Sequence, residues 1–144
     1  MVPELAPLLS ELFAELNRSG DQAFFHPHPL TEGEANRLAQ LVGRDLYYIA
    51  VADSTCVGYG FLRGWDAGYE IPSLGIAIHP GYQGLGIGRA LMHFLHAAAK
   101  LRGARRIRLK VYPQNTRAVR LYEELGYRFD RSRENEQLVG YLDL

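Results

Sequence analysis

The 144-residue sequence has a single cysteine, Cys56, and therefore cannot form a disulfide within the chain. Such sparing use of cysteine is typical of proteins from reducing compartments. No apolar run approaches the roughly 20 residues that a membrane-spanning helix needs. Residues 1–16 are acidic and interrupted by Pro3 and Pro7, so they lack the basic and apolar regions of a signal peptide. These absences predict a cytoplasmic protein without a membrane partner.

Acidic residues are also absent from the middle of the chain. Lys plus Arg and Asp plus Glu number 16 each, so the formal net charge is zero. Residues 71–122 nevertheless contain nine basic residues and no acidic one, and the balancing acids lie mostly before residue 71. A segment without carboxylates suits an anionic ligand. A nucleic-acid-binding domain is an alternative, but the motifs and interleaved aromatics of such domains are missing, so no nucleic acid is expected.

Hydrophobic periodicity predicts one α/β domain spanning residues 1–144. Helices are expected over residues 5–16, 31–41, 85–101 and 116–125. Strands are expected over residues 46–52, 57–62, 69–78, 106–111, 127–129 and 137–142. The strand at 69–78 is expected to be kinked or at an edge because it contains Pro72.

A glycine-rich segment joins the third predicted strand to the third predicted helix. Gly84, Gly86 and Gly88 let the backbone turn tightly and approach a ligand closely, and the first amides of the helix then face that ligand as free donors. The G-x-G-x-G spacing differs from the dinucleotide fingerprint, and the Lys and Ser or Thr of a P-loop are missing. The segment is expected to bind an anion, although a turn that only packs a helix on a strand shows the same glycines.

Three stretches together resemble the GNAT superfamily of N-acetyltransferases. They are residues 74–91, whose Gln-Gly-Leu-Gly-Ile-Gly at 83–88 matches the Q/R-x-x-G-x-G/A signature, residues 109–111, and Asn115 with Leu-Tyr-Glu-Glu-Leu-Gly-Tyr at 121–127. The resemblance implies an α/β (α+β) fold with a mixed, mostly antiparallel central sheet, two splayed parallel strands and flanking helices. The family normally begins with a strand, whereas residues 1–7 show no strand pattern. That first strand is expected to be absent, very short or outside this chain.

The resemblance implies acetyl-CoA as co-substrate. In the family, one strand binds the pantetheine arm through its backbone, and the glycine loop holds the pyrophosphate. The residues implied for acetyl-CoA are Ile76, Ala77, Ile78, Gln83, Gly84, Leu85, Gly86, Ile87, Gly88, Arg89, Asn115 and Tyr122. Tyr122 is implied to lie beside the thioester sulfur, where a hydroxyl with an ordinary pKa of about 10 can protonate the leaving thiolate. Apart from the family, the sequence pattern favours a buried aromatic in a helix stripe for Tyr122.

The acceptor side is less well defined by the sequence. An ammonium group must lose a proton before it attacks the thioester, so a carboxylate or histidine is expected as general base. Glu70, at the start of the predicted strand 69–78, is the first candidate, although a surface Glu at a strand end fits as well. His79 is the second candidate, although a residue before Pro80 that only shapes the turn fits as well. Candidate acceptor-binding residues are His26, His28, Arg63, Trp65, Asp66, Glu70 and His79. No cluster of further ligands accompanies the histidines, so no metal is expected.

The sequence therefore predicts an acyltransferase that moves an acetyl group from acetyl-CoA to a primary amine in a ternary complex. Family members that acetylate ribosomal proteins often have a Glu where this chain has Lys110, which favours a small-molecule acceptor. The acids before residue 71 suit a cationic acceptor. A non-catalytic acyl-CoA-binding or regulatory module and a protein N-terminal acetyltransferase are the alternatives, and a homodimer is left open.

Overall fold

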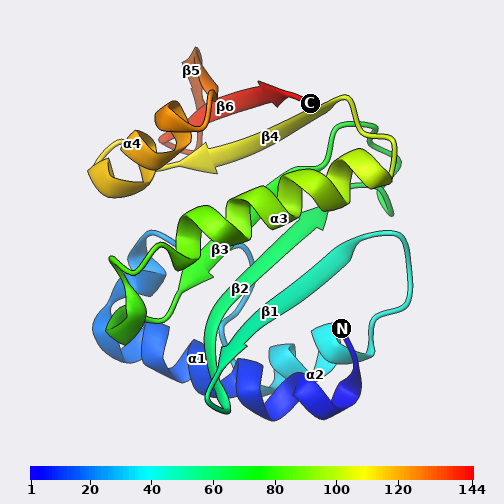
Figure 1. The fold of residues 1–144 in the computed structure, drawn as a ribbon, viewed down its shortest axis with the longest axis vertical. Helices are drawn as coiled ribbons and strands as arrows, with labels where there is room; N and C mark the ends of the chain where they lie inside the picture. Colours follow the sequence, from blue (N-terminus) through cyan, green and yellow to red (C-terminus); the bar gives the residue numbers. More distant parts are fainter.

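One mixed sheet with helices on both faces forms the protein (Figure 1). The computed structural model describes the backbone of residues 1–144 and all side chains except those of residues 131 and 132. The strands are β1 (Leu46–Ala52), β2 (Thr55–Arg63), β3 (Ser73–Ile78), β4 (Arg106–Val111), β5 (Arg128–Glu134) and β6 (Gln137–Asp143). Their order across the sheet is β1-β2-β3-β4-β6-β5, and all neighbours except β3 and β4 are antiparallel. The predicted fold class is confirmed.

The helices are α1 (Ala6–Ser19), α2 (Glu32–Gln40), α3 (Ile87–Leu101) and α4 (Thr116–Glu124), with short 3-10 helices η1 (Pro3–Leu5), η2 (Asp21–Ala23) and η3 (Pro80–Tyr82). Residues 3–19 are helical, and the described backbone contains no strand before β1. Among the described residues, no helix is long and apolar enough to cross a membrane.

Two hydrophobic clusters occupy the two faces of the sheet. On one face, the apolar stripe of α1 packs with α2 on β2 and β3, and the large buried side chains there include Phe13, Tyr59 and Phe61. On the other face, α3 and α4 cover β2, β3 and β4, with Leu95 and Ile107 fully buried (Figure 1). The face carrying α1 and α2 is called the α1/α2 face below.

Glycine permits the close packing at two points of the sheet. A Cβ at Gly60 would lie 2.9 Å from Cδ1 of Leu95, so glycine lets α3 approach β2. A Cβ at Gly75 would lie 2.2 Å from Cζ of Phe61, because the Phe61 ring lies across β3 at this position. The sheet therefore needs glycine on β2 against α3, and on β3 beneath an aromatic ring.

The structure shortens the predicted third strand. β3 begins at Ser73 rather than at residue 69, and residues 69–71 lie in the loop from β2. Pro72 has no N–H for the ladder, which places it at the strand boundary. The other predicted elements are present with shifts of a few residues at their ends. The Asp53-Ser54 turn between β1 and β2 has positive φ at both residues, as a tight two-residue hairpin requires.

β3 and β4 are joined at one end and separate along their length. They are parallel and share one residue pair, Ser73 with Arg108. The Arg108 N–H donates to the Pro72 carbonyl at 3.1 Å. Beyond this pair, toward Ile78 and Val111, the described strands form no further pair. The predicted splay of two parallel strands is confirmed. The gap between the separated parts of β3 and β4 is called the opening below, and the Ser73–Arg108 end is its closed end.

Candidate functional site

The separated part of β3 presents unpaired backbone groups to the opening. The His79 N–H donates to the Val57 carbonyl at 2.8 Å, which fixes the alternation of the β2–β3 ladder. By that alternation the backbone groups of Ala77 face Tyr59 on β2, whereas those of Ile76 and Ile78 face the side of β4. A ligand in the opening could therefore hydrogen-bond to Ile76 and Ile78. The backbone of Ala77, predicted to do the same, is engaged by β2.

The glycine loop follows at the open end of β3. Gly84 and Gly86 have φ values of 79° and 83°, and no atom lies within 4 Å of a Cβ built on either. Gly86 is the N-cap of α3, no side chain caps this helix, and the first hydrogen bond into it is donated by the Ala90 N–H to the Gly86 carbonyl at 3.0 Å. The amides of residues 87–89 are therefore free at the positive end of the helix dipole, a suitable site for a phosphate.

Charged side chains of η2, α3 and α4 lie around this loop and contact Gln83 or one another. The Gln83 Nε2 donates to Asp21 Oδ2 at 3.2 Å, and the Gln83 Oε1 accepts from Arg117 at 3.0 Å. Arg89 in the first turn of α3 forms an ion pair with Glu124 of α4, and both side chains are about half exposed. Gln83 thus links the loop to η2 and α4, while Arg89 and Arg117 bring positive charge to the helix end.

Tyr122 lies in α4 beside the same region. A Cβ at Gly88 would lie 3.7 Å from Ile78 and 3.8 Å from Leu121, so α4 meets α3 where β3 ends. Tyr122 is 9% exposed, and its ring centre is 5.8 Å from that of Tyr127. Burial raises the pKa of Tyr122 to about 12. A phenol with that pKa stays protonated at neutral pH and can donate its proton.

The Tyr122 hydroxyl is unpaired yet not sealed. Among the described side chains it makes no hydrogen bond, and Arg108 Nε is the only fully enclosed nitrogen or oxygen without a partner. The Tyr122 oxygen is therefore not fully enclosed, although the side chain as a whole is buried. Asn115, also predicted to touch the ligand, is the N-cap of α4, and its Oδ1 accepts the Ala118 N–H at 3.4 Å.

The loop between α1 and α2 crosses the α1/α2 face to reach the end of β4. His26 Nε2 shares a hydrogen bond of 2.7 Å with the hydroxyl of Tyr112, the residue after β4. His28 Nδ1 lies 2.8 Å from the Pro29 carbonyl, so this nitrogen carries the proton and Nε2 accepts from the Tyr59 hydroxyl at 2.9 Å. Burial lowers the pKa of His28. His28 anchors the loop, and His26 stands nearer the opening.

Three residues predicted to bind the acceptor make contacts within the protein. Trp65 is 7% exposed and packs in the cluster under α3, not in an exposed loop. Asp66 accepts the N–H groups of Arg44 and Asp45 at 2.8 and 3.0 Å, and these bonds lower the pKa of its carboxyl. His79 accepts the Gly81 N–H at 2.9 Å and shapes the turn after β3.

Glu70 and Arg63 lie near a pocket of about 370 Å³ at the closed end of the opening. The pocket is lined by Asp45, Arg63, Gly64, Ala67, Tyr69, Ile71, Ser73 and Arg108. Glu70 is exposed in the loop before β3, between two lining residues, and is not in the strand as predicted. Sequence reasoning missed Arg108 and Tyr112, because strict alternation in 106–111 also fits a solvated strand face.

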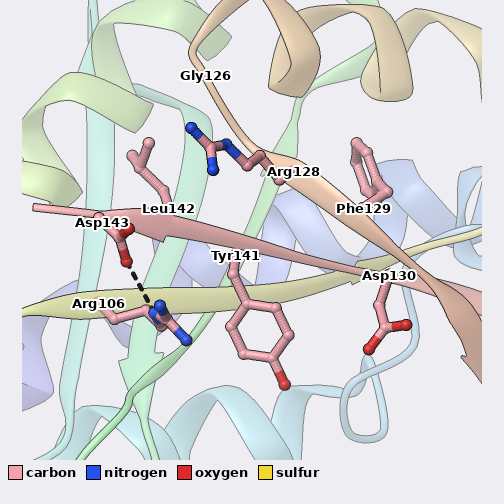
Figure 2. Close-up of a pocket in the computed structure, with 8 residues that line it drawn as sticks. All are labelled: Arg106, Gly126, Arg128, Phe129, Asp130, Tyr141, Leu142 and Asp143. Atoms are coloured by element: carbon pink, nitrogen blue, oxygen red, sulfur yellow. Dashed lines mark hydrogen bonds and ion pairs between the residues drawn. The ribbon is translucent and has the colours of Figure 1, made fainter.

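A second pocket of about 390 Å³ lies on β5 and β6, in the half of the sheet away from the glycine loop. In Figure 2 the side chains of Tyr141 and Asp130 lie on one side of β6, and those of Leu142 and Phe129 on the other. Arg106 in this pocket donates to Asp143 at 2.8 Å. Its polar groups do not converge on one point. In the described part of the chain, no group of three or more His, Cys, Asp or Glu could hold a metal.

Comparison with known proteins adds a family and a fold. Residues 9–127 match the sequence profile of the acetyltransferase (GNAT) family. An uncharacterized N-acetyltransferase of Mycobacterium tuberculosis is 40% identical over 82 residues, 56% of this chain and 51% of that protein. The [ribosomal protein bS18]-alanine N-acetyltransferase of Escherichia coli is 38% identical over 66 residues, 46% of this chain and 45% of that protein. The matches thus span about half the length of these curated relatives.

The fold has close structural counterparts. The PaiA N-acetyltransferase of Thermoplasma acidophilum, solved in complex with coenzyme A, superposes with a TM-score of 0.78 at 18% identity. The superposition covers 100% of this chain and 96% of that one. At this identity the likeness concerns the fold.

Proposed function

Because the chain belongs to the acetyltransferase (GNAT) family, we propose that it transfers the acetyl group of acetyl-CoA to the primary amine of a small molecule, by direct attack in a ternary complex. The observation that carries the proposal is one continuous set of unpaired donors. The backbone of Ile76 and Ile78 leads along the opening to the free amides of residues 87–89. An extended amide-containing arm that ends in phosphates has the matching shape and charge.

The residues present fit acetyl-CoA in chemistry as well as in shape. Ile76 and Ile78 would hold the amides of the pantetheine arm, and Gly84 and Gly86 leave the pyrophosphate room to approach the backbone. Arg89 and Arg117 supply positive charge beside it. A protein with this fold has been solved in complex with coenzyme A, which supports coenzyme A as a ligand of this fold.

Transfer then requires an attack and a proton for the leaving group. The neutral amine nitrogen forms a bond to the thioester carbonyl carbon, and the C–S bond breaks as the tetrahedral intermediate collapses. The leaving thiolate takes the Tyr122 proton, and the amine gives up a proton to a base. We retain Glu70 as that base, acting through water, since it stands between the pocket-lining residues Tyr69 and Ile71. His79, the second candidate from the sequence, accepts the Gly81 N–H. We therefore add His26 as the other candidate, because its ring reaches the end of β4.

The test combines acetyl-CoA binding with thiol release. Acetyl-CoA is titrated into the protein by calorimetry, and release of CoA thiol is followed over amino sugars, polyamines, amino acids, aminoglycosides and N-terminal peptides. Thiol release with a small amine supports the proposal. Binding without release over the whole panel identifies a non-catalytic acyl-CoA-binding module. Release with peptides alone favours a protein N-terminal acetyltransferase, the activity named for the Escherichia coli relative.

A further inference from the structure

We propose that the acceptor amine also carries a carboxylate, which Arg63 and Arg108 bind in the pocket at the closed end of the β3–β4 opening. This inference rests on the proposed function, because it names the class of acceptor for the same site. Its basis is the position, the charge and the unsatisfied hydrogen-bonding capacity of this pocket.

The pocket is placed to receive the second substrate. Ser73 and Arg108, which form the single residue pair between β3 and β4, both line it. Alternation along β2 puts Arg63 on the same side as Phe61, and the Arg63 Nη1 donates to the Pro27 carbonyl at 3.2 Å, so the pocket lies on the α1/α2 face. The glycine loop and α3 lie beyond the other end of β3. A ligand arm that follows Ile78 and Ile76 from that end leads to the pocket.

The charge of the pocket is positive. Its lining has two guanidinium groups, of Arg63 and Arg108, and one carboxylate, of Asp45. The carboxylate is already committed to the backbone, because Asp45 Oδ1 accepts the N–H groups of Gly64 and Asp66, each at 3.1 Å. The Arg63 guanidinium lies 4.7 Å from the centre of the Phe61 ring, which fixes its plane while most of its donors remain free.

The Arg108 guanidinium has donors that are not hydrogen-bonded. Among the described side chains, its Nε is the only fully enclosed nitrogen or oxygen without a hydrogen-bond partner. One terminal nitrogen of the same group is paired with Glu134 of β5, which does not line the pocket. That nitrogen is closed to a ligand as well, but the Arg108 side chain is 24% exposed and its other terminal nitrogen pairs with no described group. A carboxylate in the pocket can reach this terminal nitrogen and be bound there together with Arg63.

The size and remaining lining restrict the acceptor further. A volume of about 370 Å³ is at the small end of ligand sites and suits a molecule the size of an amino acid. Tyr69 and Ser73 offer hydroxyls, and Ala67 and Ile71 offer apolar contact. The structure therefore points to an amino-carboxylate acceptor and replaces the expectation of a purely cationic one.

The experiment compares each amino acid with its own carboxamide and its decarboxylated amine in the thiol-release assay. We expect kcat/KM for the acid to exceed that for the amide by about tenfold or more, as for other charge-assisted hydrogen bonds. Arg108→Gln should abolish the preference, and Arg63→Gln should weaken it. Arg106→Gln is the matched control, because Arg106 lies on the same face of β4, forms a similar ion pair with Asp143 and does not line the pocket. Equal or better rates with amides would overturn the proposal while leaving the acetyltransferase intact.

Direct binding separates this inference from the proposed function. Each amino acid that gives release, or the full set if none does, is titrated by calorimetry into CoA-saturated protein. Binding that is lost in Arg108→Gln and kept or strengthened in Glu134→Gln supports the site, since the latter frees a guanidinium nitrogen. The absence of any carboxylate-dependent binding refutes it. The same titration is made with aminoalkylphosphonates. If these bind more tightly than the matched amino carboxylates, the assignment to a carboxylate is refuted.

Discussion

The hydroxyl of Tyr122 can be removed with little effect on the folded protein and a large effect on the reaction. In Tyr122→Phe the ring still fills its place beside Tyr127, and the lost oxygen has no hydrogen-bond partner among the described residues. The free energy of unfolding should therefore change by no more than about 0.5 kcal/mol. The rate should fall much further, because a general acid typically contributes about 10²- to 10⁴-fold.

The raised pKa of Tyr122 keeps its hydroxyl protonated over a wide pH range. Burial moves the pKa from 10 to about 12, and two pKa units correspond to about 2.7 kcal/mol against the phenolate. The proton is thus held at every pH below about 10, and the wild-type rate should show no alkaline decline from Tyr122 in that range. A loss of 10²-fold in Tyr122→Phe corresponds to the same 2.7 kcal/mol in the transition state.

Thiol release is a clean assay for this variant. The protein's own thiol, Cys56, is 1% exposed, and burial raises its pKa to about 11, so a thiol reagent reports the CoA product. Acetyl-CoA affinity is measured in parallel by calorimetry and should be unchanged. Turnover at the wild-type rate in Tyr122→Phe would refute the acid role. A loss of acetyl-CoA binding equal to the loss of rate would show instead that Tyr122 holds the ligand.

Three further predictions concern the glycines and one histidine. Gly86→Ala and Gly103→Ala place a Cβ in open space at similar φ values of 83° and 86°, so each should cost about 1 kcal/mol in urea unfolding. Only Gly86→Ala should lose acetyl-CoA affinity by calorimetry, and equal affinity in both variants would argue against phosphate binding by the glycine loop. Gly75→Ala should destabilise by about 1–3 kcal/mol, since its Cβ would lie 2.2 Å from Phe61, and an unchanged urea midpoint would contradict this packing. Burial lowers the pKa of His96 from 6.5 to about 4, so the stability that it contributes is present above pH 6.5 and is lost as pH falls toward 4. His96→Gln should reduce that loss when urea midpoints are compared at pH 7 and 4.5.

Local signals predicted the parts of the fold that depend on neighbours along the chain. Gly20 ends α1 with φ of 85°, and Thr31 caps α2 by accepting the Glu34 N–H at 3.1 Å, as the residue types suggested. A Thr followed three residues later by a Glu is also the pattern of a capping box, but the Glu34 carboxylate pairs with Arg37 instead of the Thr31 N–H. The glycine loop was identified for the same local reason. Positive φ and free helix amides are properties of a short segment.

Tertiary contacts decided what the sequence could not predict. Trp65 follows a glycine in a polar stretch, which suggests an exposed ring, yet α3 covers it. From the sequence, Arg108 is one of several charged residues on the exposed face of an alternating strand. In the fold it lies opposite Ser73 at the closed end of the opening. Tyr112 gained its partner His26 from a loop 86 residues away. Each assignment depended on segments that are distant in sequence.

The single residue pair between β3 and β4 makes the backbone ladder of this protein discontinuous. β1, β2 and β3 form one ladder, and β4, β6 and β5 form another. The packing of side chains beneath α3 therefore holds most of the contact between the two ladders. A ligand that bonds to Ile76 and Ile78 would fill the place of a missing strand. Ligand binding would then increase the free energy of unfolding, by about 2.7 kcal/mol at a free ligand concentration of one hundred times Kd. Amide exchange at Ile76 and Ile78 would report how firmly the two ladders are closed.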